Sequence, residues 1–189
     1  MKTEAFISII IPCYNRASMI AKTIESLQQQ AYTNYEIIVV DDGSTDNTEQ
    51  VVNEMADEKT RYFKKENGER AAARNYGARL AKGSYLNFFD SDDIALPNHL
   101  SEAAKLIAAK NSPEWFHLGY QWADENGEIY KTEDQFTGEL LNDILADGNH
   151  LSCNGVVIRK DIFLKHLFKE DRELSASEDY ELWLRLAAR

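Results

Sequence analysis

The chain has 189 residues, enough for one sizeable hydrophobic core, and this length predicts a single domain. Its formal net charge of −11 argues against non-specific nucleic-acid binding, because such binding needs a cationic surface. Two cysteines provide no disulfide framework, and no apolar run approaches the roughly 20 residues of a membrane-spanning helix, so we expect a cytoplasmic protein.

The first half of the chain predicts strands that alternate with helices. Apolar runs predict strands over residues 6–12, 36–40, 61–63 and 86–89. Helical spacing of apolar residues predicts helices over about 17–30, 51–55, 70–81 and 97–110. Pro12 is expected to end the first strand, because proline cannot donate to a strand ladder. This alternation indicates an α/β fold with a mainly parallel sheet covered by helices.

The second half of the chain changes its pattern. Strands predicted over 115–122 and 128–132 flank Asn126-Gly127, which favours a hairpin turn. A short helix is predicted over about 138–146, a strand over 155–159, helical structure over 160–167 and a last helix from Ser177. Because the apolar pattern of this helix continues to Arg189 without a C-cap, we expect a C-terminally truncated fragment.

Polar side chains follow three of the predicted parallel strands, at residues 12–15, 41–44 and 90–93. The carboxyl ends of parallel strands meet at one edge of a sheet, where ligands bind in doubly wound folds. Asp90 and Asp92 are separated by one residue, a spacing that suits a shared divalent cation with phosphate oxygens completing its shell. A solvated turn that caps the next helix is the alternative, since aspartate is common in both places.

Five segments of the sequence resemble the inverting family 2 glycosyltransferases of the GT-A fold. They occur in the family's order and cover nearly the whole chain: Ile9 to Asn15, Ile38 to Asp46, Ala73 to Gly77, Asp90 to Asp93, and Glu178 to Arg185. The resemblance implies a nucleotide-sugar donor, most often a UDP-sugar, with Mn²⁺ or Mg²⁺ as the cofactor. It divides the domain into a nucleotide-binding half (1–97) and an acceptor and catalytic-base half (98–189).

The resemblance implies that the loop after the first strand binds the donor nucleotide. Tyr14 would pack on the uracil face, Pro12 would shape the pocket, and Asn15 would belong to the same donor site. Asp42 would accept a hydrogen bond from uracil N3–H, while Asp41 would cap the following helix. Which of these two carboxylates reads the base stays open.

The resemblance also assigns roles to the acidic loop around residue 90. Asp90 would hold the ribose hydroxyls, Ser91 would contribute to the donor site, and Asp92 would bind the metal that bridges the diphosphate. Asp93 would support Asp92 or cap the next helix. The metal would take up charge that develops on the leaving phosphate.

Asp179 is the expected catalytic base, since an acceptor hydroxyl is a poor nucleophile until a base can take its proton. Without the resemblance, Glu178 and Asp179 are equally well explained as acids in the first turn of a helix, where they suit the helix dipole. Arg70 and Arg74 lie one turn apart on the alanine-rich helix. Either could approach the diphosphate, hold a site aspartate, or lie on a solvated face.

Two other interpretations of the sequence compete with a glycosyltransferase. A sugar nucleotidyltransferase would also combine a metal carboxylate with a parallel sheet, but it requires a glycine-rich, basic phosphate loop after the first strand, where this chain has Pro12 to Arg16. A non-catalytic nucleotide-sugar-binding module is the second. Neither the donor sugar nor the hydroxyl-bearing acceptor is fixed by the sequence.

Overall fold

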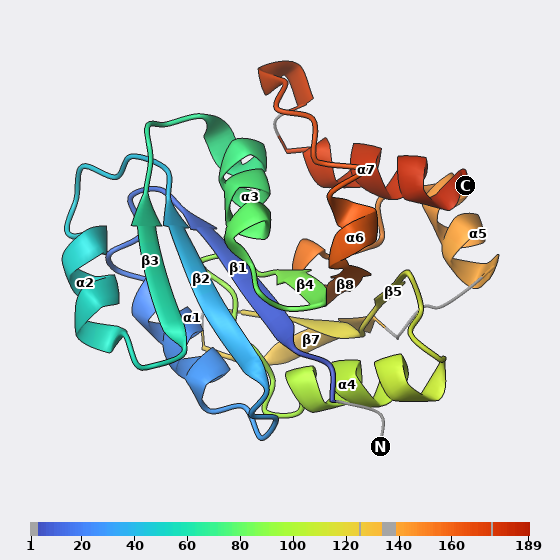
Figure 1. Ribbon diagram of the computed structural model, residues 1–189, viewed down its shortest axis with the longest axis horizontal. Helices are drawn as coiled ribbons and strands as arrows, with labels where there is room; N and C mark the ends of the chain where they lie inside the picture. Colours follow the sequence, from blue (N-terminus) through green and yellow to red (C-terminus); the bar gives the residue numbers. More distant parts are fainter. Residues whose placement is uncertain (1–3, 125, 134–138, 175) are drawn as a thin grey trace.

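The computed structural model describes residues 4–124, 126–133, 139–174 and 176–189. Its centre is a six-stranded sheet with the order β3-β2-β1-β4-β8-β5 (Figure 1). The strands of this sheet are β1 (Ile7–Cys13), β2 (Tyr35–Asp41), β3 (Thr60–Lys64), β4 (Tyr85–Phe88), β5 (Trp115–His117) and β8 (Val156–Arg159). The four strands of the first half pair in parallel, which confirms the predicted α/β fold with a mainly parallel sheet.

Helices cover both faces of the sheet, as Figure 1 shows. One face carries α1 (Ile20–Gln28), α2 (Thr48–Met55) and α4 (His99–Ala109), which share an apolar cluster with the odd-numbered residues of β1 and β2. The other face carries α3 (Glu69–Leu80), α5 (Glu139–Asp147), α6 (Lys160–Phe163) and α7 (Glu178–Ala187). Strands covered on both sides are mostly apolar, and this explains the β-branched runs of β1 and β2. The buried polar residues Ser8 and Glu36 satisfy each other through a hydrogen bond of 2.7 Å.

Pro12 does not end the first strand, contrary to the prediction, because β1 continues to Cys13. The carbonyl of Ile10 accepts from Phe89 N on the β4 side, and the carbonyl of Cys13 accepts from Asp42 N on the β2 side. Backbone groups alternate between the two sides along a strand, so Pro12 faces the β4 side, beyond the last residue of β1 that β4 pairs. No ladder hydrogen bond is lost there, and proline is tolerated.

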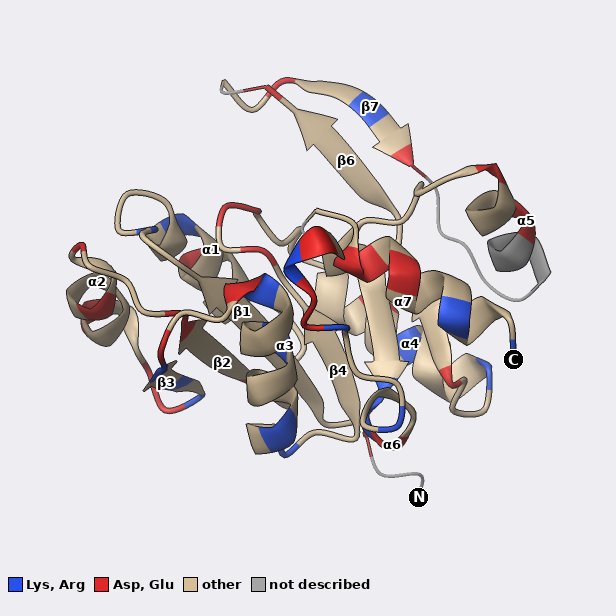
Figure 2. Ribbon diagram, turned by 90° about the horizontal axis from the view of Figure 1, so that it is seen from above, with Lys and Arg blue, Asp and Glu red and all other residues tan. Residues whose placement is uncertain are grey.

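The second half of the chain closes the sheet in the antiparallel sense. Strand β8 runs antiparallel to both β4 and β5. The predicted strand over 115–122 is wrong as one element: β5 ends at His117, and β6 (Tyr120–Ala123) pairs instead with β7 (Ile129–Glu133). This pairing confirms the predicted hairpin, which projects from the body of the molecule in Figure 2. Glu125 of its turn and Gly138, the predicted start of α5, lie outside the described residues.

Two predicted helices are shorter than expected. Helix α1 begins at Ile20 rather than near Ala17, and α6 ends at Phe163 rather than near Leu167. The chain leaves α6 early, and both Phe163 and the later Phe168 pack against the ring of Phe88. The ring centroid of Phe163 lies 4.7 Å from that of Phe88, and the ring centroid of Phe168 lies 5.1 Å from it.

The register of the sheet aligns the three polar strand ends. Cys13 at the end of β1 pairs with Asp41 at the end of β2, and Phe88 at the end of β4 lies beside Ile10. The loops that follow these strands therefore share the carboxyl edge of the sheet. Among the described residues, no helix combines the length and apolar character needed to cross a membrane.

Candidate active site

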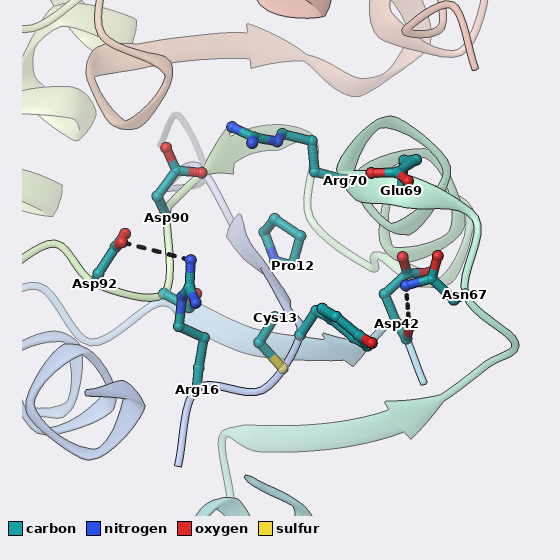
Figure 3. A pocket seen from close by; sticks show the side chains of 11 residues that line it. Pro12, Cys13, Arg16, Asp42, Asn67, Glu69, Arg70, Asp90 and Asp92 are labelled. Carbon is teal, nitrogen blue, oxygen red and sulfur yellow. Dashed lines mark hydrogen bonds and ion pairs between the residues drawn. The ribbon is translucent and has the colours of Figure 1, made fainter. Parts of the chain in front are cut away.

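A cleft of about 330 Å³ lies at the carboxyl edge of the sheet. The loops after β1, β2, β3 and β4 and the start of α3 all contribute to its walls. Figure 3 shows Asp90 and Asp92 on one side of the cleft and Asp42 with Asn67 on the other, with Pro12 and Cys13 between them. The residues that line it are Pro12, Cys13, Tyr14, Arg16, Asp42, Asn67, Glu69, Arg70, Asp90, Ser91 and Asp92.

Tyr14 and Asn15 occupy the loop after β1 but have different surroundings. Tyr14 lines the cleft and is 47% exposed, so it presents aromatic surface there. Asn15 is not among the lining residues; its backbone has a φ of 52° and its N–H donates to Ser44 Oγ at 2.8 Å. Its side-chain oxygen accepts from Thr45 N at 2.9 Å. Asn15 therefore fastens this loop to the loop after β2.

The adjacent carboxylates Asp41 and Asp42 point to different places. Asp41 is fully buried and lies outside the cleft, where it accepts from Ser44 N at 2.7 Å and from the Tyr62 hydroxyl at 2.6 Å. Asp42 lines the cleft and accepts from Lys65 Nζ at 2.6 Å and from Gly68 N at 3.0 Å. An ionised carboxylate has about four acceptor sites, so Asp42 can accept a further hydrogen bond from a ligand.

The loop after β4 presents its carboxylates in three environments. Asp90 accepts from Arg74 at 2.6 Å, and Asp93 accepts from Asn154 Nδ2 at 2.8 Å. Asp92 is 42% exposed and lies 3.9 Å from a guanidinium nitrogen of Arg16. Burial, together with the charges of Asp90 and Asp92, raises the pKa of Asp93 to about 6. Mutual repulsion in this loop favours a cation next to it.

The donor set of this loop fits a hard divalent cation that also binds a diphosphate. Asp92 directs a half-exposed carboxylate into the cleft, and the cationic group of Arg16 already approaches it without forming a close hydrogen bond. Mg²⁺ and similar ions are commonly held by one or two carboxylates while phosphate and water oxygens complete the shell. The described residues contain no cluster of three or more candidate protein ligands for a metal ion.

Arg74 lies beneath the cleft and joins three segments of the chain. It is 1% exposed and donates to Asp90 at 2.6 Å and to Glu178 Oε1 at 2.8 Å. Glu178 is itself buried, and Arg70 on the cleft wall approaches it at 3.7 Å. Arg74 therefore contacts Asp90 from beneath the cleft, whereas Arg70, the other arginine of this helix considered from the sequence, lines the cleft together with Arg16.

Asp179 lies in the first turn of α7, directly after the buried Glu178, and outside the residues that line the cleft. Its Oδ1 accepts from Tyr180 N at 2.6 Å and lies 3.5 Å from Asn149 Nδ2. Burial raises the pKa of Asp179 above its ordinary value, the direction that makes a carboxylate a stronger base. Its neighbour Glu178 contacts Arg74, which in turn contacts Asp90, so the start of α7 is connected to the Asp90 side of the cleft.

The structure brings together most, but not all, of the residues expected from the sequence. Those that line the cleft are Pro12, Tyr14, Asp42, Asp90, Ser91 and Asp92; those that lie behind or beside it are Asn15, Asp41, Arg74 and Asp179. Sequence reasoning missed Arg16, Lys65 and the buried partner role of Glu178. Arg16 directly follows the polar loop 12–15 and could have been found by its position, whereas Lys65 follows a weak edge strand and carried no comparable signal.

Several known proteins are similar to this chain over most of its length. An uncharacterized glycosyltransferase of Rickettsia typhi is 33% identical over 95% of this chain and 58% of its own length. The Escherichia coli UDP-Glc:alpha-D-GlcNAc-diphosphoundecaprenol beta-1,3-glucosyltransferase WfgD is 31% identical over 96% of this chain and 69% of its own. The chain spans 27% to 58% of the first five curated relatives.

Solved structures share the fold. Residues 1–349 of Staphylococcus aureus TarS in complex with UDP-GlcNAc match with a TM-score of 0.76 and 22% identity, over 94% of this chain and 52% of that one. A mannosyltransferase of Pyrobaculum calidifontis in complex with GDP-Man and Mn²⁺ matches with a TM-score of 0.70 and 20% identity, over 96% and 51%. The family model of glycosyl transferase family 2 matches residues 8–163, which is most of the chain. The chain belongs to glycosyl transferase family 2 and has the GT-A fold.

Proposed function

We propose that this chain binds a UDP-sugar with Mn²⁺ or Mg²⁺ and transfers the sugar, with inversion, to an acceptor hydroxyl in glycan biosynthesis. The observation that carries the proposal is the arrangement of the cleft. Asp42, a carboxylate with spare acceptor capacity, lies across the cleft from the acidic loop of Asp90 and Asp92 (Figure 3). The half-exposed aromatic side chain of Tyr14 lines the same cleft. A nucleoside diphosphate needs these two kinds of contact at its two ends.

The base-binding end of the cleft suits uracil. Tyr14 would stack on the ring with Pro12 at its edge, and Asp42 would accept from uracil N3–H, which cytosine lacks. Asp41 is proposed to shape the loop only, because both its oxygens already accept hydrogen bonds from Ser44 and Tyr62. Asn15 is proposed to support Tyr14 from behind through its contacts with the loop after β2.

The diphosphate end of the cleft suits a metal complex of the donor. Asp92 would bind the cation, Asp90 would hold ribose hydroxyls, and Ser91 would line the site between them. When bound, the divalent ion supplies positive charge that stabilises the leaving diphosphate. Arg74 keeps Asp90 in place rather than touching the donor, because it is buried against two carboxylates.

Asp179 is proposed to take the proton of the acceptor hydroxyl. Its raised pKa increases its affinity for that proton. It directly follows Glu178, which forms an ion pair with Arg74 beneath the cleft. The hydroxyl oxygen would then attack the anomeric carbon from the side opposite the diphosphate, and this displacement inverts the configuration. Relatives support the donor class: WfgD is named for a UDP-Glc donor, and TarS was solved with UDP and with UDP-GlcNAc.

Calorimetric titration of UDP with and without Mn²⁺ tests the donor and metal assignments together. Mn²⁺ should tighten UDP binding by about tenfold, equivalent to about 1.4 kcal/mol, in the wild type. Asp92→Asn should remove this effect of Mn²⁺. Asp161→Asn is the matched control, since it removes one charge from an exposed aspartate beside Arg159, away from the cleft. If wild type and Asp92→Asn respond equally to Mn²⁺, the metal assignment is wrong; if UDP does not bind, the donor assignment is wrong.

A further inference from the structure

A second cavity, of about 260 Å³, lies between the start of α4 and the hairpin β6–β7. It shares no lining residue with the donor cleft. Its lining residues are Leu96, Asn98, His99, Glu102, Leu118, Gly119, Tyr120, Gln121, Thr132 and Glu133. We call it the hairpin cavity.

Part of the lining of the hairpin cavity comes from the same edge of the sheet as the donor cleft. Strand β5 is antiparallel to β8, which is antiparallel to β4, so β5 and β4 run in the same direction. Residues 118–121 follow the carboxyl end of β5, just as the acidic loop follows the carboxyl end of β4. On its other side the cavity is bounded by Leu96, Asn98 and His99, which come shortly after Asp93 in the chain.

One short loop connects the hairpin cavity to the proposed catalytic base. Asn149 Nδ2 lies 3.5 Å from Asp179 Oδ1, and the carbonyl of the next residue, His150, accepts from the Tyr120 hydroxyl at 3.2 Å. Consecutive Cα atoms are about 3.8 Å apart, so Tyr120 and Asp179 flank the same stretch of backbone. A molecule whose hydroxyl reaches Asp179 therefore has the hairpin cavity beside it.

The lining of the cavity suits a sugar ring. Tyr120 presents an aromatic surface that packs edge-to-face with His117 and Trp122, at centroid distances of 5.6 Å and 5.9 Å. Carboxamides from Asn98 and Gln121 supply both donors and acceptors. A pyranose has apolar C–H faces and a rim of hydroxyl groups, and a pocket with an aromatic wall and a few polar side chains can satisfy both.

The charge of the cavity favours a neutral ligand over a phosphorylated one. Glu102 and Glu133 line it, whereas none of the described residues that line it is a lysine or an arginine. The carboxylates are partly compensated by Lys105 and Lys131 at 2.7 Å and 2.5 Å, but these lysines are not part of the lining. A phosphate group placed there would meet two carboxylates without a cation between them.

We propose that the hairpin cavity binds a neutral sugar unit of the acceptor, next to the unit whose hydroxyl reaches Asp179. This inference rests on the proposed function, because it takes Asp179 as the base that receives the acceptor. It makes the acceptor a glycan of at least two sugar units. Tyr120 and Gln121 become specificity-determining residues for the acceptor and have no role in donor binding.

Ligand-observed NMR titrations of cellobiose, lactose and chitobiose, and of their 1-phosphates, in the presence of UDP and Mn²⁺ test the proposal. Tyr120→Ala should weaken binding of the neutral disaccharide that binds most tightly by about tenfold, through loss of the stacking surface and of the contacts it orders. The matched control is Tyr130→Ala, the same substitution on the partner strand at a residue that is 68% exposed and outside the cavity. It should leave binding within about twofold. Gln121→Ala, at an exposed residue, provides a second test should Tyr120→Ala fail to fold, with an expected loss of about threefold.

The result has separate meanings for the two proposals, since UDP binding is measured in the same samples. Binding of a neutral disaccharide that depends on Tyr120 or Gln121, with unchanged UDP affinity, supports the hairpin cavity as the acceptor subsite. Absence of disaccharide binding, binding that neither Tyr120→Ala nor Gln121→Ala weakens, or a preference for the 1-phosphates overturns it while leaving the donor proposal intact. Absence of UDP binding together with Tyr120-dependent disaccharide binding instead overturns the donor proposal and keeps the sugar site.

Discussion

Asp41 and Asp42 are adjacent in the chain, but their carboxylates lie in different environments. Asp41 is enclosed by Ser44 and Tyr62, and Asp42 faces the cleft. We predict that Asp42→Asn narrows the preference for UDP over CDP by about tenfold, because a carboxamide offers the pyrimidine a donor as well as an acceptor. Calorimetry with both nucleotides measures this ratio, which does not depend on the fraction of folded protein.

Asp41→Asn is the matched control for the neighbouring position. It should leave the ratio of UDP to CDP affinity unchanged and lower the free energy of unfolding by about 1–3 kcal/mol, since a buried carboxylate that accepts two hydrogen bonds is replaced. If Asp41→Asn lowered the ratio of UDP to CDP affinity and Asp42→Asn left it unchanged, the two residues would have each other's proposed roles.

The raised pKa of Asp179 predicts a particular dependence of stability on pH. The folded state holds this proton more tightly than the unfolded state, so the carboxyl contributes stability at low pH that is lost as pH rises through the raised pKa. Asp179→Asn should therefore unfold at a higher temperature than wild type at pH 7, with a smaller difference near pH 4. The same variant should lose release of UDP from a UDP-sugar and acceptor while keeping UDP affinity.

Asp161→Asn gives the opposite sign and serves as the control for this measurement. A hydrogen bond from Arg159 lowers the pKa of Asp161, so its contribution to stability is present above the ordinary aspartate pKa and is lost as pH falls. Its substitution should lower the unfolding temperature slightly at pH 7. An Asp179→Asn variant that is less stable at pH 7 and still transfers sugar would refute Asp179 as a partly buried base.

At the scale of single elements, Gly77 determines how closely α3 approaches the sheet. A Cβ at this position would lie 2.6 Å from Ile10 Cγ2 and 3.1 Å from Val40 Cγ2, both stiff β-branched side chains in central strands. We predict that Gly77→Ala lowers the unfolding temperature, because overpacking costs about 1–3 kcal/mol and exceeds the roughly 1 kcal/mol gained in helix propensity. Arg79→Ala on the exposed side of the same helix should change stability by no more than about 0.5 kcal/mol. Equal unfolding temperatures for both variants would contradict this account.

The elements that the sequence predicted well are those whose pattern depends on local burial. Strands β1, β2 and β4 are mostly apolar and fully buried, and helix α3 is an alanine-rich segment between two turns. The split of residues 115–122 into β5 and β6 was not predictable in the same way. Aromatic residues occur on both sides of the break, which lies where the pairing partner changes from β8 to β7. Long-range pairing decides that boundary.

At the scale of the whole molecule, the candidate site was predictable only as a set of loops. Motif positions and the rule for parallel strand ends indicated that residues 12–15, 41–44 and 90–93 would meet, and the cleft contains part of each. They did not indicate that Glu178 would be buried against Arg74, since the two residues are 104 positions apart and each has an ordinary helical explanation. The connection between the Asp90 loop and α7 therefore emerged only from the structure.

This connection predicts strong coupling between Arg74 and Glu178. Arg74→Met leaves the buried Glu178 carboxylate without its closest cation. Such a change typically lowers the free energy of unfolding by about 3–5 kcal/mol. Glu178→Met alone should lower the free energy of unfolding by a similar amount. The double variant should be more stable than the sum of the two losses implies, because two apolar side chains can pack where the ion pair was. Urea unfolding of the four proteins measures the coupling energy.

The same four proteins separate a structural role of the ion pair from a functional one. Arg74→Met also removes the cation that holds Asp90, so UDP should bind more weakly to both variants that lack Arg74, even where the double variant recovers stability. Glu178→Met keeps the contact between Arg74 and Asp90 and should bind UDP within about twofold of wild type. Additive losses of stability would show that the pair is not coupled. Unchanged UDP affinity in the double variant would show that Arg74 does not position Asp90 for the donor.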